Sequence, residues 1–193
     1  KFIQTWEGCV YHMTCRGSRY NPTLTTVGKE SDEWLSQNNR SARNFIRKWG
    51  HFVKHNDTMK PIVPNRYDVG FVVRNCDEYK LTLLEPWCDT IYTDVSYDRY
   101  INLEQKNTKF DLKKKLKRYE DQKINDIVIE FDAVKLTNQS FEFFNMLQLM
   151  LEDSGIVGEL EFDIFKLKIN KLTDHNKNLV NLSDSWYKNQ LLQ

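Results

Sequence analysis

Residues 125–134 read NDIVIEFDAV and form the strongest strand pattern in the chain. Ile127, Ile129 and Phe131 share one face, because successive side chains of a strand point to opposite sides of the sheet. Val128 adds an apolar side chain on the other face. A run that is apolar on both faces is typical of an inner strand of a parallel sheet.

The strongest helix pattern follows at once, over residues 137–155, TNQSFEFFNMLQLMLEDSG. Its apolar positions recur every three or four residues, as one face of a helix requires. They are Phe141, Phe144, Leu147, Met150 and Leu151. Gly155 is placed to end the helix, since glycine readily adopts the left-handed conformation that follows a last helical turn.

Upstream, residues 67–95 predict a βαβ unit. Residues 67–73, YDVGFVV, read as a second buried strand, and residues 76–88 carry helical spacing that ends near Pro86. Residues 89–95, DTIYTDV, read as a third strand. Strand, short helix and strand in this order make parallel neighbours in one sheet.

Two further elements are predicted downstream. Residues 107–123 read as a helix that begins at Thr108, with its basic run as a solvated face rather than a nucleic-acid patch. Its apolar positions are Phe110, Leu112 and Leu116. Residues 158–172, GELEFDIFKLKINKL, alternate between apolar and charged side chains, which is typical of an edge strand with one solvent-exposed face.

These patterns predict an α/β fold, with a mainly parallel sheet and flanking helices over residues 59–172. The break before this unit is residues 55–68, where two prolines disfavour helix. Residues 1–58 then form a separate helix-containing segment. Residues 173–193 form a polar, partly ordered tail.

Acidic residues follow two of the predicted parallel strands. Asp94 and Asp132 stand at the carboxyl ends of these strands, where open α/β sheets bind ligands. No glycine-rich loop follows Val73 or Phe131. The sequence therefore predicts neither a dinucleotide-binding fold nor a phosphate cradle.

The composition of the chain limits the kinds of partner that we expect for it. The formal net charge is only +1 at pH 7, which disfavours general nucleic-acid binding and attraction to an anionic membrane. No apolar run reaches the roughly 18–20 residues of a membrane span, so we expect no span and a cytoplasmic protein. The four cysteines are too scattered for a disulfide scaffold. Frequent asparagine and lysine suggest an AT-rich coding genome such as that of a phage or large virus, which would place the protein in the host cytoplasm.

Residues 39–55, NRSARNFIRKWGHFVKH, predict a helix capped by Ser41. Its apolar positions are Ala42, Phe45, Ile46, Trp49 and Phe52 or Val53, and its flanks carry Arg40, Arg43, Arg47 and Lys48. His51 and His55 are four residues apart, a spacing that can present two imidazoles to a metal. A structural role is favoured, because Gly50 frays the helix there and spacing supplies no third ligand.

The same stretch resembles a known family. In the inverting nucleotide-sugar glycosyltransferases of family 2, the catalytic GT-A domain often finishes with a pattern like N-x-x-x-F-x-x-K-W-G, and residues 44–50 read NFIRKWG. Residues 8–19, GCVYHMTCRGSR, look like that family's preceding element, an apolar strand that ends in a histidine and leads into a basic, serine-containing loop. The resemblance covers residues 5–50.

The resemblance implies that residues 1–58 close a GT-A-like domain whose nucleotide-binding strand, acidic metal-binding triplet and catalytic carboxylate lie before Lys1. It implies that His12 helps to hold a divalent metal, Mg²⁺ or Mn²⁺, or the diphosphate of the donor. Arg16 and Ser18 would contact phosphate from the loop. Such cations and donors neutralise the charge that develops on a leaving diphosphate.

We therefore expect the C-terminal portion of a metal-dependent glycosyltransferase that moves a sugar from a nucleotide sugar to a glycan or other acceptor. The alternative is a non-catalytic viral or bacterial interaction domain that docks on a partner through residues 62–172. Only the first function requires His12, Arg16 and Ser18 to converge on one cleft.

Overall fold

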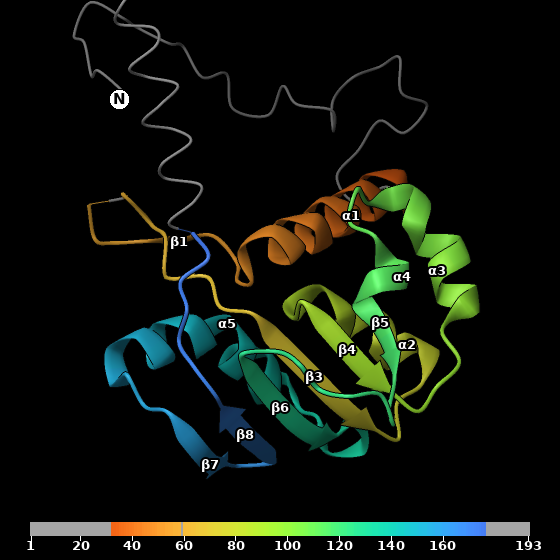
Figure 1. The fold of residues 1–193 in the computed structure, drawn as a ribbon. Helices are drawn as coiled ribbons and strands as arrows, with labels where there is room; N and C mark the ends of the chain where they lie inside the picture. Colours follow the sequence, from red (N-terminus) through yellow and green to blue (C-terminus); the bar gives the residue numbers. More distant parts are fainter. Residues whose placement is uncertain (1–31, 59, 177–193) are drawn as a thin grey trace, which may run out of the picture.

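The computed structural model describes residues 32–58 and 60–176, and its centre is a six-stranded sheet (Figure 1). The order of strands across the sheet is β5-β4-β3-β6-β8-β7. Their bounds are β3 (Val69–Arg74), β4 (Thr90–Thr93), β5 (Leu116–Arg118), β6 (Ile127–Asp132), β7 (Gly158–Phe162) and β8 (Phe165–Ile169). A separate two-stranded ribbon pairs β1 (Lys54–His55) with β2 (Pro61–Ile62).

The predicted parallel sheet is confirmed. β3 pairs in parallel with β4 on one side and with β6 on the other, and β4 pairs in parallel with β5. The three strands that were expected to be inner and parallel are those over residues 69–73, 91–93 and 127–131. All of β3 except its last residue is buried, which explains its nearly continuous apolar sequence.

The edge of the sheet beyond β6 is an antiparallel hairpin. Residues 158–172 were expected to form one edge strand, but the chain turns at Asp163 and Ile164, so that β7 and β8 pair with each other. Asp163 has φ 52°, a left-handed conformation that aspartate tolerates in tight turns. β7 is the edge strand and β8 lies between it and β6.

The remaining regular elements are helices. They are α1 (Asp32–Trp49), α2 (Glu78–Leu84), α3 (Asp98–Glu104), α4 (Leu112–Lys115) and α5 (Asn138–Ser154), with short 3-10 turns η2 (Glu85–Trp87), η3 (Gln105–Asn107) and η4 (Ala133–Lys135). α5 ends as predicted, because Gly155 has φ 60° and its amide donates to the Leu151 carbonyl at 3.0 Å.

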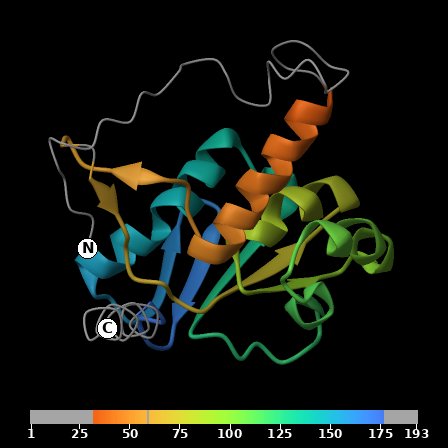
Figure 2. The same ribbon diagram turned by 90° about the horizontal axis from the view of Figure 1, so that it is seen from above.

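The core lies between the sheet and the helices α2 and α5 (Figures 1 and 2). The Phe144 ring of α5 lies 4.7 Å from that of Phe71 and 5.7 Å from that of Phe131, measured between ring centroids. Trp87 of η2 and Phe165 of β8 also contact Phe144. These rings join helix, inner strands and hairpin in one apolar cluster.

The other face of the sheet is covered over β3 and β4 by the segment that leads from β5 to β6. The hydroxyl of Tyr92 donates to Asn125 Oδ1 at 3.0 Å, beneath this segment. Gly70 allows the approach, since a Cβ there would lie 2.3 Å from Asn125 Oδ1. Over β6, β8 and β7 the same face carries charged, partly exposed side chains.

The prediction of one helix over residues 107–123 is wrong. Four residues of helix, α4, are followed at once by β5, and the short helix α3 was not foreseen. Leu116 pairs with Ile91 of β4, so its burial in the sheet outweighs the helical spacing of the neighbouring residues.

α1 begins at Asp32, so Ser41 lies inside the helix and does not cap it. Arg47, which was expected on a flank of the helix, is fully buried together with Glu85 of η2. Phe45 and Trp49 are only half-buried.

The expected division of the chain at residue 58 stays a prediction. Within the described part of the chain, no helix combines the length and apolarity that a membrane crossing needs.

Candidate ligand site at the carboxyl edge of the sheet

The topology selects one edge of the sheet as a candidate site. From β3 the chain moves outward through β4 to β5, then returns to β6 on the other side of β3. Open α/β sheets bind ligands outside the carboxyl ends of the strands at such a reversal. The carboxyl ends of β3, β4, β5 and β6 lie together along this edge (Figure 1).

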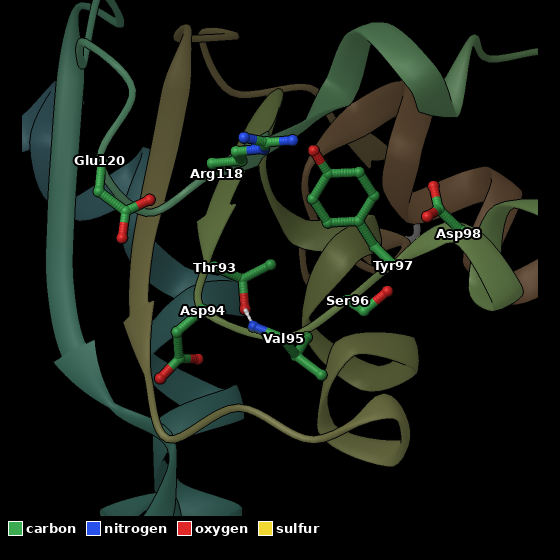
Figure 3. Close-up of a pocket in the computed structure, with 8 residues that line it drawn as sticks. All are labelled: Thr93, Asp94, Val95, Ser96, Tyr97, Asp98, Arg118 and Glu120. Atoms are coloured by element: carbon green, nitrogen blue, oxygen red, sulfur yellow. Dashed lines mark hydrogen bonds between the residues drawn. The ribbon is translucent and has the colours of Figure 1, made fainter.

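A pocket of about 360 Å³ opens at the carboxyl ends of β4 and β5 (Figure 3). It is lined by the last residue of β4, the loop after it and the first residue of α3, and by the last residue of β5 and a residue shortly after it. These residues are Thr93, Asp94, Val95, Ser96, Tyr97, Asp98, Arg118 and Glu120. The volume lies at the lower end of the range of small-molecule pockets, about 300–1,000 Å³.

The lining combines anionic, cationic and aromatic groups. Asp94, Asp98 and Glu120 supply carboxylates, and all three residues are exposed. Arg118 supplies a guanidinium and Tyr97 a half-buried ring. Carboxylates accept hydrogen bonds from hydroxyl and amino groups, whereas a guanidinium donates in pairs to phosphate or carboxylate. The pocket is therefore suited to a polar ligand that carries both kinds of group and one flat ring.

Asn75 connects the two carboxylates that the sequence singled out. Its backbone amide donates to Asp94 at 2.9 Å, and its side-chain amide donates to Asp132 at 2.9 Å. Asn75 has φ 51°, a left-handed conformation that asparagine adopts more readily than most residues. The prediction that Asp94 and Asp132 stand at the carboxyl ends of parallel strands is confirmed, although Asp132 lies outside the lining of the pocket.

Both carboxylates are held by the backbone. Asp94 also accepts from the amide of Cys76 at 3.3 Å. The amide of Val134 donates to Asp132 at 2.9 Å and lowers the pKa of that carboxyl. Burial raises the pKa of the Cys76 thiol to about 11, so this neighbour is protonated at neutral pH and is a poor nucleophile.

The site residues implied by the resemblance are not among the described residues. His12, Arg16 and Ser18 fall outside the described residues, so their convergence on a cleft stays a prediction. The His51 ring is buried and its Nδ1 lies 2.5 Å from the carbonyl of Phe52, whereas His55 is exposed. Among residues 32–58 and 60–176, no group of three histidine, cysteine, aspartate or glutamate side chains is placed to hold a metal.

Sequence reasoning missed most of the lining. Arg118 was assigned to an exposed helix face, because the strand β5 is only three residues long and follows a basic run. Tyr97 and Asp98 follow the predicted strand over residues 89–95, and their position after its carboxyl end was the one signal available.

Comparisons of the chain with protein-family models, with curated proteins and with solved structures found no match.

Proposed function

We propose that the chain is part of a sugar-nucleotide-dependent glycosyltransferase, and that the pocket at the carboxyl ends of β4 and β5 holds the nucleoside end of the donor. The observation that carries the proposal is the mixed charged and aromatic lining of this pocket at the carboxyl ends of two parallel strands, the end of an open α/β sheet where ligands bind. The resemblance of residues 5–50 to family 2 enzymes suggests the reaction class, and the pocket suggests where the donor is held.

Each kind of lining group suits one part of a nucleoside phosphate. The Tyr97 ring offers a face on which a base can stack. Asp98 and Glu120 can accept hydrogen bonds from ribose hydroxyls or from the amino groups of a base. Arg118 can donate to the first phosphate. Three carboxylates against one guanidinium disfavour a bare polyphosphate, which favours binding through the nucleoside.

For the diphosphate of the donor, the proposal assigns His12, with Arg16 and Ser18, as the groups that hold it, and Mg²⁺ or Mn²⁺ would supply charge neutralisation when bound. The described residues do not fit a metal on their own, because Asp94 and Asp132 are already committed to backbone and amide donors. No part of the proposal at β4 and β5 therefore depends on the metal.

Calorimetric titration of UDP-glucose and GDP-mannose into the chain, with and without MnCl₂, tests the proposal. At least one donor should bind, and Arg118→Ala and Tyr97→Ala should each weaken binding about tenfold, equivalent to roughly 1.4 kcal/mol. The control is Arg40→Ala, which removes an exposed arginine from α1. His12→Ala should weaken only the part of donor binding that depends on Mn²⁺. If neither donor binds, or if Arg118→Ala binds like the wild type, the assignment of this pocket is wrong.

The alternative, a non-catalytic interaction domain, is favoured by a different observation. An apolar hollow of about 460 Å³ lies between α1, η2 and α5, and Ile46, Trp87 and Phe141 are among the residues that line it. Phe52 and Leu83, also in its lining, are exposed. Exposed apolar surface of this kind marks contact sites on many proteins. A chain that binds no donor but retains this hollow would belong to the second class.

A further inference from the structure

The two edges of the sheet differ in how open they are to another strand. β5, at one edge, is three residues long and ends in Lys117 and Arg118, features that discourage pairing. β7, at the other edge, is five residues long and contains no proline or lysine. Within the described residues, no strand pairs with its outer side.

The register of the hairpin shows which backbone groups of β7 point outward. Phe162 and Phe165 flank the two-residue turn, and such a pair exchanges two hydrogen bonds. Hydrogen-bonded and non-hydrogen-bonded pairs alternate along an antiparallel ladder. Glu159 and Glu161 therefore occupy non-hydrogen-bonded positions opposite Lys168 and Lys166. Their amides and carbonyls point away from β8, toward the free edge.

The side chains of the same two residues give this edge a chemical pattern. Glu159 and Glu161 lie on the face that no helix of the described residues covers, with about three-quarters of each side chain exposed. Each carboxylate approaches one lysine of β8, at 3.3 Å for Glu159 and 3.5 Å for Glu161. Opposite residues of antiparallel strands share a face, so an added strand would place its own side chains beside these carboxylates.

The other face of the edge is apolar. Leu160 is half-buried and Phe162 is 47% exposed, although its ring stacks on Phe143 of α5 at 5.1 Å. Just before β7, Ile156 and Val157 are more than half exposed. A strand that alternates basic and apolar residues would thus meet carboxylates with one face and apolar side chains with the other. β8 has this alternation on the inner side of β7.

We propose that the free edge of β7 binds an extended segment of a partner protein in which lysine or arginine alternates with apolar residues. The segment adds antiparallel to β7, and its backbone hydrogen-bonds to Glu159 and Glu161. This interaction is separate from the proposed donor site, since β7 and β4 are not neighbours in the sheet.

A second copy of this chain does not suit the edge. Antiparallel pairing of β7 with β7 about Leu160 would set Glu159 of each strand against Glu161 of the other. Pairing centred on Glu161 would oppose two copies of that residue. Directly opposed like charges destabilise a pair of strands, so the occupant carries the opposite charge.

The test uses a fluorescein-labelled peptide, KVKVKVK, and anisotropy at low salt. We expect saturable binding below ~1 mM, and at least tenfold slower hydrogen exchange of the Glu159 and Glu161 amides in the complex. Two control peptides separate strand addition from charge attraction. One has the same composition in the order KKKKVVV, and the other is KVKVKVK with alternate backbone nitrogens methylated to remove the hydrogen bonds to β7.

The variant Glu159→Gln, Glu161→Gln should weaken binding at least tenfold. The matched control Glu33→Gln, Glu142→Gln changes the net charge equally at exposed positions of α1 and α5 and should not. Equal binding of the methylated or reordered peptide would reduce the interaction to non-specific charge and overturn the proposal. So would the absence of saturable binding, or sedimentation that shows the chain itself dimerising in a manner that Glu161→Pro abolishes, because proline removes an outward backbone amide of β7.

Discussion

Arg47 of α1 and Glu85 of η2 form an ion pair with 2.6 Å between guanidinium nitrogen and carboxylate oxygen, and both side chains are fully buried. Lys115 reaches the same carboxylate at 2.7 Å, and Glu104 accepts from Arg47 at 2.8 Å. Tyr100 donates its hydroxyl to Glu85. This buried network holds α1 against three elements that follow β3 in the chain.

Removing Arg47 should destabilise the protein strongly. Arg47→Met leaves Glu85 and Glu104 in the interior with one cation fewer, and we expect a loss of about 3–5 kcal/mol in the free energy of unfolding. Urea denaturation followed by tryptophan fluorescence measures it. Arg47→Lys should recover less than half, because an ammonium cannot bond both carboxylates with the geometry of a guanidinium. A loss from Arg47→Met no larger than that from the exposed control Arg40→Ala, about 0.5 kcal/mol, would contradict a structural role for the network.

Stability should fall in acid because of Glu85. Burial opposes its ionisation, but Lys115 and Arg47 outweigh burial and lower its pKa from 4.5 to about 2. Between these two values the unfolded chain binds more protons than the folded one, so this contribution is complete above pH 4.5 and is lost as the pH falls toward 2. Denaturation midpoints measured between pH 6 and 3 should decline steeply for the wild type. The Glu85→Gln variant should start lower and decline less over the same range.

Gly50 should tolerate no side chain. Its φ is +77°, and a Cβ there would lie 2.0 Å from Gln148 Nε2, so Gly50→Ala combines backbone strain with a clash. We expect a loss of about 2–3 kcal/mol. Gly155→Ala is the matched control, because its φ is +60° but nothing lies within 4 Å of its Cβ. That variant should lose only about 1 kcal/mol. Equal losses would mean that Gln148 moves aside at no cost.

Two aromatic truncations should differ in their cost. Phe144 is 2% exposed and contacts rings from both the sheet and η2, so Phe144→Ala should lose about 3–5 kcal/mol. Trp49 is only half-buried, although the sequence places it among the apolar positions of its helix, and Trp49→Ala should cost about half as much. Chemical denaturation of both variants decides the order. A larger loss at Trp49 would indicate that the end of α1 packs more tightly than its exposure implies.

The sequence by itself was sufficient for the elements whose pattern is local. The inner strands β3, β4 and β6 are apolar on successive residues, and α5 has both its apolar stripe and its terminal glycine, so period and turn chemistry identify them. The carboxyl-end positions of Asp94 and Asp132 follow from the same patterns once the strands are known to be parallel.

Tertiary structure decided the features that depend on residues distant in the chain. Leu116 belongs to a strand because Ile91 lies beside it, and Arg47 is buried because Glu85, 38 residues away, supplies its counter-charge. Arg118 and Tyr97 line one pocket only because β4 and β5 are neighbours. Local propensities differ by less than about 1 kcal/mol per residue, whereas burying a large apolar side chain contributes about 1.5–3 kcal/mol and leaving a buried charge without its partner costs about 3–5 kcal/mol. The long-range contacts therefore prevail where the two conflict.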